Sequence, residues 1–286
     1  MRNANVECLV NCQAVLGEGP VWAEAERALY WVDIKGPAIF RLDPILGAYK
    51  RWRPPFIVSS LVPRISGGFV GASERGIAWI DPALGCYELV HNPESHLPGN
   101  RSNDGKVDRA GRYWFGTMDD GERQASGHLY RIGRNLTATA VDSDYLVPNG
   151  PAFDLAGSRM YVNDSAKRLT YAFDLAADGT PSNKRVFASF GESDGYPDGM
   201  TVDAEDFLWI AFWDGWCLRR LDPEGRIERT VQMPVQRPTS CTFGGAELDR
   251  LFVTSARVGL SHAPLAGGLF AFDPGVCGVG DSAFSG

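Results

Sequence analysis

The stretch Tyr196–Asp203, YPDGMTVD, ends in a six-residue pattern, DGMTVD, that recurs along the chain. Related copies are NDGKVD at Asn103–Asp108 and NGPAFD at Asn149–Asp154. Each copy begins with Asn or Asp, has an apolar residue at its fifth position and ends in Asp. A short turn and an aromatic-rich run (RYWFGT, RMYVND or FLWIAF) follow each copy. This order predicts a strand, a tight hairpin and a second strand, with the final Asp accepting hydrogen bonds from backbone N–H groups of the turn.

Weaker copies of the pattern extend the series in both directions. They lie in GEGPVWAEAERALYWVDI, SSLVPRISGGFVGA and TSCTFGGAELDRLFVTSA. The first residues of the six copies are Glu18, Ser60, Asn103, Asn149, Asp198 and Ser240, at intervals of 42, 43, 46, 49 and 42 residues. A period in the forties built only from strands is typical of a β-propeller. We therefore predict an all-β fold, a six-bladed β-propeller with four-stranded antiparallel blades around a central channel, formed by residues 1–286 as a single domain.

The ring of such a propeller must also close. The short N-terminal run Val6–Val10 is expected to complete the sheet that ends near Phe270–Asp273, because this pairing would cover an otherwise open strand edge. The first and last parts of the chain would then share one blade.

Composition narrows the class of partner. The formal net charge is -7 and the isoelectric point is about 5.2, which disfavours nucleic acid and anionic membrane surfaces as partners. No apolar run of membrane-spanning length and no signal-peptide core are present, so a cytoplasmic protein is expected. The six cysteines form no CxxC pair, which predicts reduced and mostly buried thiols. A small molecule is the expected partner, and no obligate protein partner is evident.

The repeat also predicts a site. In a propeller, equivalent positions on the innermost strands meet at one mouth of the channel. The first residues of the six copies would therefore form a ring of carboxylate, amide and hydroxyl oxygens. Oxygen donors of this kind suit a hard divalent cation such as Ca²⁺, Mg²⁺ or Mn²⁺.

Other catalytic signatures are missing from the sequence. The four histidines show neither HxH nor HExxH spacing, which argues against a histidine zinc site. There is no phosphate-binding loop and no dinucleotide fingerprint.

Six motifs resemble, in order and over almost the whole chain, those of the gluconolactonase/senescence-marker-protein family of regucalcin-like sugar lactonases. The motifs are GEGPVW, NRSNDGKVDRAGRYWFGTM, NGPAFD, YPDGMTVDAEDFLWIAFW, SCTFGG and PLAGGLF. The resemblance implies a six-bladed propeller with one divalent metal ion in the channel mouth. It also implies a carboxylic ester hydrolase of carbohydrate metabolism that opens sugar lactones such as glucono-, xylono- or arabinono-lactone to aldonic acids.

Carried over to this chain, the resemblance implies that Glu18, Asn149 and Asp198 bind the metal and that Asp198 is also the catalytic proton acceptor. Ca²⁺ is the preferred ion, with Zn²⁺, Mn²⁺, Mg²⁺ and Fe²⁺ as alternatives. The implied substrate contacts are Arg101, Asn103 and an acidic residue after Gly116-Thr117-Met118. In this region the sequence departs from the pattern of the animal members. We take Glu122 as the acidic contact, with Asp120 as the alternative.

Two other functions stay open. One is a non-enzymatic calcium-binding regulatory propeller. The other is a propeller esterase or organophosphate hydrolase with a similar oxygen-ligated metal, although Arg101 among polar groups favours a hydroxylated substrate.

Overall fold

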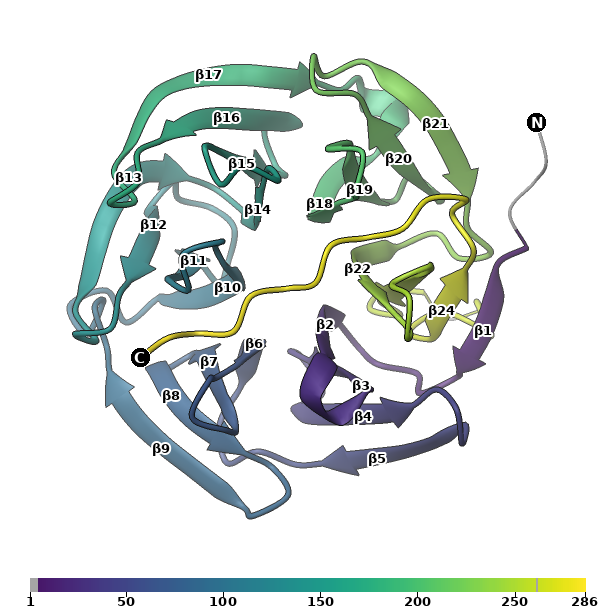
Figure 1. The fold of residues 1–286 in the computed structure, drawn as a ribbon, viewed down its shortest axis with the longest axis horizontal. Helices are drawn as coiled ribbons and strands as arrows, with labels where there is room; N and C mark the ends of the chain where they lie inside the picture. Colours follow the sequence, from purple (N-terminus) through teal and green to yellow (C-terminus); the bar gives the residue numbers. More distant parts are fainter. Residues whose placement is uncertain (1–4, 261) are drawn as a thin grey trace.

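Residues 5–260 and 262–286 are described by a computed structural model, in which six four-stranded antiparallel sheets surround a central channel (Figure 1). This confirms the predicted six-bladed propeller. The predicted domain, residues 1–286, includes residues 1–4 and 261, which lie outside the described part. The strands are β1 Glu7–Val10, β2 Gly17–Ala23, β3 Ala28–Asp33, β4 Ala38–Asp43, β5 Ala48–Trp52, β6 Val58–Pro63, β7 Phe69–Ser73, β8 Gly76–Asp81, β9 Cys86–His91, β10 Asn100–Val107, β11 Tyr113–Asp119, β12 Gly127–Ile132, β13 Ala138–Tyr145, β14 Pro148–Phe153, β15 Arg159–Asp164, β16 Leu169–Leu175, β17 Pro181–Ser189, β18 Tyr196–Val202, β19 Leu208–Trp213, β20 Cys217–Leu221, β21 Ile227–Gln232, β22 Pro238–Gly244, β23 Arg250–Ser255 and β24 Leu269–Phe272.

Blades 1 to 5 are β2–β5, β6–β9, β10–β13, β14–β17 and β18–β21, each running from the channel outwards. Blade 6 has the order β22-β23-β24-β1, so the N-terminal strand is its outermost member. Glu7 pairs with Ala271 and Cys8 with Phe270 in antiparallel register. The predicted ring closure is therefore confirmed, and it covers the edge of β24 with a strand from the other end of the chain.

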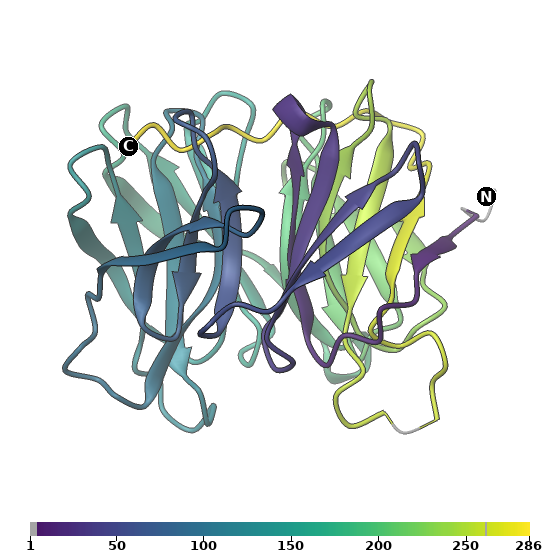
Figure 2. The same cartoon turned by 90° about the horizontal axis from the view of Figure 1, so that it is seen from below.

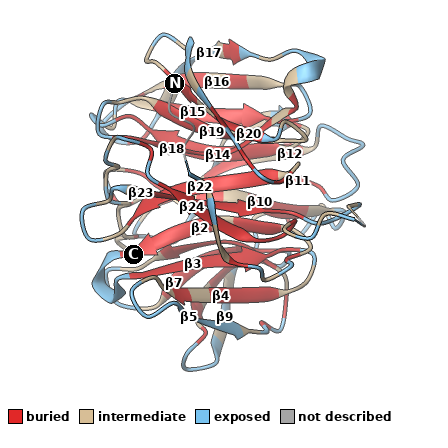
Figure 3. Ribbon diagram, turned by 90° about the vertical axis from the view of Figure 1, so that its right-hand side faces the viewer, coloured by how far each residue is buried: buried red, intermediate tan, exposed pale blue. Residues whose placement is uncertain are grey.

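Burial falls from the channel side to the rim of each blade (Figure 3). In blade 1, all six residues of β3, ALYWVD, are buried, whereas four of the five residues of the outer strand β5, AYKRW, are exposed. The middle strands such as β3 are covered on both faces and are largely apolar, whereas the rim strand β5 mixes polar and apolar residues. Large aromatic side chains such as Trp114 and Trp209 are fully buried.

The last residue of each repeat pattern stabilises a hairpin, as predicted. Asp203 Oδ1 accepts hydrogen bonds from the backbone N–H groups of Glu205 (3.0 Å) and Phe207 (3.1 Å). Asp108 and Asp154 hold their own turns in the same way. These three aspartates lie at the ends of the inner strands opposite to the first residues of the copies, so they take no part in a site at the other mouth.

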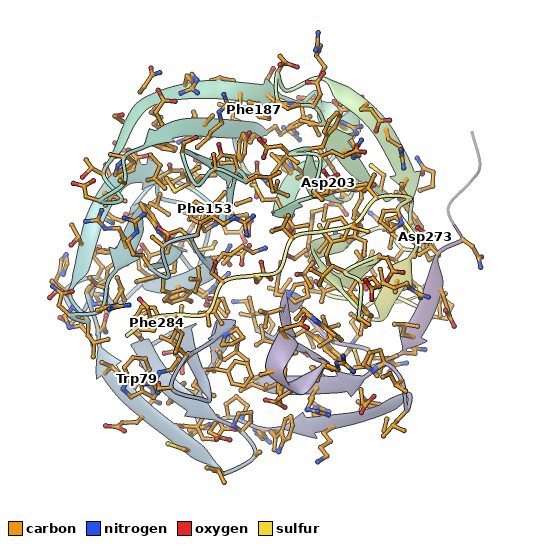
Figure 4. All side chains as sticks on the ribbon, in the orientation of Figure 1. Trp79, Phe153, Phe187, Asp203, Asp273 and Phe284 are labelled. Carbon is orange, nitrogen blue, oxygen red and sulfur yellow. The ribbon has the colours of Figure 1, made fainter. Side chains whose placement is uncertain are left out.

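The C-terminal segment, residues 273–286, crosses one face of the ring over the channel (Figures 1 and 2). Bridges tie it to blade 5 through Asp203 and Gly278 and to blade 2 through Arg64 and Phe284. The Phe284 side chain is fully buried beside Trp79, with ring centroids 6.1 Å apart (Figure 4). This segment therefore covers the channel at the hairpin-aspartate end.

Two remaining sequence expectations concern helices and cysteines. Among the described residues, the helices are the single 3₁₀ turns Glu24–Glu26 and Glu192–Asp194, and none is long and apolar enough to cross a membrane. All six cysteines are free, but only Cys217 and Cys241 are buried, so the prediction of mostly buried thiols was wrong. The other four lie on or near the surface, at strand ends or in loops.

Candidate active site

Each innermost strand loses its regular pairing beside the first residue of its repeat copy. The register shifts lie after Glu18 in β2, beside Ser60 in β6, around Asn103 in β10, after Asn149 in β14, around Asp198 in β18 and beside Ser240 in β22. Such bulges bend a strand and re-aim its side chains. A glycine occupies the bulge in three of the six strands, at Gly19, Gly150 and Gly199.

Two of these glycines show why a side chain is not tolerated there. Gly150 has a φ of +85°, a conformation that L-residues with a Cβ rarely adopt. At Gly199, an added Cβ would lie 2.1 Å from the Ser240 hydroxyl of the neighbouring blade. The Gly and Pro residues of EGP, NGP and PDG therefore allow the carboxylates and amides beside them to approach the channel closely.

A cavity of about 470 Å³ opens at the mouth where these strands begin. All six residues singled out from the sequence line it: Glu18, Arg101, Asn103, Glu122, Asn149 and Asp198. Ser60 and Ser240 do not. The Ser60 hydroxyl lies 2.5 Å from that of Tyr113, and Ser240 lines a narrower part of the channel. The ring expected from the repeat is thus formed by four of its six members.

Two buried carboxylates, Glu18 and Asp198, line the cavity, and little positive charge lies near them to offset their own. Burial raises the pKa of Asp198 well above its ordinary value, and the charges of Glu18 and Asp104 add to this. Burial likewise raises the pKa of Glu18 well above its ordinary value, with the charge of Asp104 next in importance. The nearby Arg101 guanidinium opposes the shift of Glu18. A bound cation would relieve this electrostatic cost.

Asp104 is a third carboxyl group in the channel, half-buried, and the sequence interpretation did not include it. Burial raises its pKa to about 6, against the charge of Lys106 and the N–H groups of Gly105 and Gly150. Its oxygens accept from those two N–H groups at 2.8 and 3.0 Å. It lines the narrower channel rather than the mouth cavity. Its position directly after Asn103 was the feature of the sequence that could have identified it as a channel residue.

Hydrogen bonds fix the orientation of the two amides. Asn149 Nδ2 donates to Ser165 Oγ (2.8 Å), which in turn donates to the Pro197 carbonyl (2.6 Å). The Asn149 Oδ1 atom is therefore turned towards Asn103, whose Nδ2 donates to it at 3.0 Å. An amide oxygen held in this way is a suitable ligand for a hard cation.

The two acidic candidates after Met118 have different surroundings. Glu122 lines the cavity from the loop between β11 and β12, with a φ of +55°. Asp120 is not among the lining residues, and its Oδ1 accepts a hydrogen bond from Arg101 Nε at 2.5 Å. The Asp119 carboxylate supports the loop by accepting from the N–H of Arg123 at 2.9 Å.

Blade 5 contributes an aromatic wall that sequence reasoning did not identify. Tyr196 and Trp213 are paired across β18 and β19, and both line the cavity. The Arg168 guanidinium lies 4.2 Å from the centre of the Tyr196 ring, and that of Arg237 lies 4.6 Å from the Trp213 ring. The next residue, Asp214, also lines the cavity and accepts from Arg237 Nε at 2.6 Å.

Two loops contribute to the wall of the cavity. The loops Asp119–Ser126 and Trp213–Cys217 each supply residues to the cavity, Glu122 from the first and Trp213 and Asp214 from the second. The composition of the two loops did not predict that they would meet at the same cavity.

The side chains that line the cavity offer only a few possible metal ligands. Within residues 5–260 and 262–286, no group of three or more His, Cys, Asp or Glu side chains is arranged to hold a metal ion. The expected set contains two carboxylates and one amide, Glu18, Asp198 and Asn149. Such oxygen-only ligands fit a hard cation better than a soft one.

Comparison with known proteins gives the family. Residues 16–257 match the SMP-30/Gluconolactonase/LRE-like region. The chain is 34% identical to a 6-deoxy-6-sulfogluconolactonase of Pseudomonas putida, covering 99% of this chain and 100% of that protein. It is 33% identical to regucalcin of Xenopus laevis, covering both proteins completely. The solved structure of a calcium-binding protein, regucalcin, from Agrobacterium tumefaciens superposes with a TM-score of 0.92 at 29% identity, over 97% of this chain and 96% of that one. The chain therefore belongs to the SMP-30/gluconolactonase/LRE-like family.

Proposed function

We propose that this protein is a metal-dependent hydrolase that opens sugar lactones to aldonic acids. The observation that carries the proposal is the single mouth cavity, into which Glu18, Asn149, Asp198, Arg101, Asn103 and Glu122 all project from four different blades or their loops. Membership of the family and the similarity to a sugar lactonase of Pseudomonas putida support the same reaction class.

Glu18, Asn149 and Asp198 would hold the cation. The two carboxylates are buried and repel each other, and the Asn149 oxygen is oriented by Ser165, so this set fits a hard divalent ion. Ca²⁺ is the preferred ion, in keeping with the calcium-binding regucalcin of Agrobacterium tumefaciens. When bound, a divalent cation supplies polarisation of the lactone carbonyl group and stabilises the negative charge that develops on its oxygen.

Asp198 is the proposed proton acceptor. Its side chain is 6% exposed and lines the cavity, so its carboxylate faces the space that the lactone and water would occupy. It would take a proton from the attacking water and return it to the ring oxygen when the C–O bond breaks. The product is then a hydroxy acid with the ring opened.

Arg101, Asn103 and Glu122 are proposed to hold the sugar hydroxyl groups. Arg101 and Asn103 donate hydrogen bonds, whereas the Glu122 carboxylate accepts them. The position of Glu122 on the cavity wall supports it over Asp120 as the acidic substrate contact. Fixing the hydroxyls orients the carbonyl carbon relative to Asp198.

The charge of the wall favours an uncharged lactone. Four carboxylates, Glu18, Glu122, Asp198 and Asp214, line the cavity, and Arg101 is the one guanidinium among its described lining residues. Arg101 already pairs with Asp120. An anionic substituent, such as the sulfonate that the name of the Pseudomonas putida relative implies, would be repelled here. Glucono-, xylono- and arabinono-lactone are therefore the proposed substrates. The cytoplasm is the proposed location of the protein.

The carboxylate, amide and guanidinium groups that line the cavity favour a hydroxylated substrate over an apolar aryl ester or organophosphate. The calcium-binding alternative rests on a specific observation, the regucalcin similarity, and needs a direct test. In that case the cation would bind to Glu18, Asn149 and Asp198 without turnover.

The decisive experiment measures acid release from a panel of aldonolactones with a pH indicator, after chelation and after adding back Ca²⁺, Mg²⁺, Mn²⁺ or Zn²⁺. We expect turnover that is lost with chelator and restored by at least one ion. Calcium binding by calorimetry without turnover of any lactone would instead support the regulatory alternative. Turnover that is unaffected by complete metal removal would overturn the proposed metal dependence.

A further inference from the structure

A chain of three charged residues joins two blades that are not neighbours. Asp120, in the loop after β11 of blade 3, accepts from Arg101 Nε at 2.5 Å through its Oδ1 atom. The same oxygen accepts from Lys35 Nζ at 2.6 Å. Lys35 lies in the turn between β3 and β4 of blade 1. Blade 2 separates these blades in the ring (Figure 1). It has only Glu74 and Arg75 between β7 and β8, so this hairpin is shorter than those of blades 1 and 3.

The hydrogen bonds of Arg101 leave one end of its guanidinium free. Nε donates to Asp120, and Nη1 donates to the Ser102 carbonyl (2.9 Å) and to Asn103 Oδ1 (2.8 Å). Nη2 makes no hydrogen bond to any residue in the described part of the chain. Arg101 is 7% exposed and lines the mouth cavity, so Nη2 keeps donors that are available to a ligand there.

Asp120 needs a second partner to hold this geometry. It is half exposed, at 51%, and lies on a loop, so its carboxylate has several rotamers available in water. Lys35 restricts this choice from the opposite side. Partial burial acts to raise the pKa of Asp120, but the hydrogen bonds from Lys35 and Arg101 hold that pKa below its ordinary value. The carboxylate therefore stays ionised between its two cations.

We propose that Lys35 is a positioning residue for substrate binding. Through Asp120 it holds the Arg101 guanidinium so that Nη2 faces the sugar hydroxyls, although Lys35 itself does not line the cavity. The inference rests on the proposed lactonase function and adds to it a residue of blade 1 that controls a substrate contact of blade 3. Because the pair is exposed, its loss should affect the free energy of unfolding little and substrate binding more.

The test compares lactone hydrolysis by the calcium-loaded wild type, Lys35→Met and Lys35→Arg. We expect the KM of Lys35→Met to rise about three- to fivefold, the size of one exposed ion pair, with kcat close to the wild-type value. Lys35→Arg should restore KM, because a guanidinium can also reach the Asp120 carboxylate. In the wild type, added NaCl should raise KM as it screens the pair, and this salt effect should be weaker in Lys35→Met.

The matched control is Arg185→Met. Arg185 and Asp174 form an ion pair on the rim of blade 4 with exposed fractions of 37% and 50%, against 35% and 51% for Lys35 and Asp120. Arg185→Met removes one positive charge, as Lys35→Met does, and should leave KM unchanged. An Asp120→Asn background supplies a second check, because Lys35→Met should have no further effect on KM once Asp120 is neutral.

The outcomes separate the two proposals. A wild type that hydrolyses no lactone would refute the proposed function and this inference with it. A wild type that hydrolyses lactones, with the KM of Lys35→Met equal to that of Arg185→Met, would refute the role of Lys35 alone. An equal effect of Lys35→Met in the wild-type and Asp120→Asn backgrounds would show that Lys35 does not act through Asp120.

Discussion

Asn103 Nδ2 donates a hydrogen bond to Asn149 Oδ1 at 3.0 Å, so a proposed substrate contact of blade 3 directly touches a proposed metal ligand of blade 4. The same Asn103 side chain accepts from Arg101 and donates to the Pro148 carbonyl. The proposed metal-binding and substrate-binding groups are therefore joined through one buried amide.

Replacing this amide should impair both functions. Asn103→Ala leaves the buried Asn149 oxygen and an Arg101 N–H without their partner, each at about 1–3 kcal/mol. We expect kcat/KM for the preferred lactone to fall about 10- to 100-fold, with weaker Ca²⁺ binding in calorimetry. Asn135→Ala, at an exposed turn of the same blade, should change neither quantity. Unchanged kcat/KM in Asn103→Ala would contradict the proposed contact.

The two aspartates of Tyr196–Asp203 should respond oppositely to the same change. Asp198→Asn removes the proposed proton acceptor and should lower kcat about 100- to 10,000-fold. It also removes a buried charge, so the melting temperature of the metal-free protein should stay equal or rise. Asp203→Asn weakens a buried ion pair with Arg220 at 2.8 Å and should lower the melting temperature while leaving kcat per folded molecule unchanged. Full activity of Asp198→Asn would exclude it as the base.

Calcium should stabilise the protein more at neutral than at acid pH. The pKa values of Glu18 and Asp198 are raised by burial in the metal-free fold, so the stability linked to their protonation is present at low pH. It is lost as the pH rises through these raised values, and the two charges then repel each other. A bound cation removes this cost and must displace fewer protons at higher pH.

At pH 7.5, Ca²⁺ at about 100 times its Kd should raise the melting temperature by about 5 °C, and at pH 5 by less. Thermal unfolding in chelator and in Ca²⁺ at both pH values measures this difference. Glu18→Gln should weaken the binding of Ca²⁺ in calorimetry and reduce the pH dependence. A larger calcium shift at pH 5 than at pH 7.5 would rule out a site built from these two carboxylates.

The C-terminal segment should contribute stability and no catalysis. Phe284 is fully buried beside Trp79 and Tyr113, so Phe284→Ala should cost about 3–5 kcal/mol of unfolding free energy. Because the segment covers the end of the channel away from the mouth cavity, kcat and KM at temperatures well below unfolding should stay at wild-type values. Leu84→Ala, at a side chain that is 82% exposed, is the matched control. Equal chemical denaturation midpoints for the two variants would show that the Phe284 anchor is not needed.

Sequence and structure differ most in what they say about contacts between blades. The hairpin role of Asp203 was predictable because it depends on N–H groups two and four residues away. The link between Lys35 and Asp120 was not, because these residues are 85 positions apart and meet only when blades 1 and 3 take their places in the ring. The aromatic pair Tyr196 and Trp213 was missed for a different reason. Aromatic residues near strand ends usually belong to the core, so nothing in the sequence marked these two as cavity residues.

The sequence by itself determined the six-bladed fold, its closure by the N-terminal strand, the turn aspartates and six of the residues that line the mouth cavity. Each of these follows from a repeated local pattern or from motifs in register, which need no knowledge of distant contacts. Only the tertiary structure decided that Ser60 and Ser240 leave the ring of site residues and that Asp120 pairs with Arg101 and Lys35 instead of lining the cavity. It also decided that the C-terminal segment covers the opposite end of the channel. The physical reason is that the strand bulges and the unequal hairpin lengths set where each side chain lies. Which side chains then meet depends on the packing of blades that are far apart in the sequence.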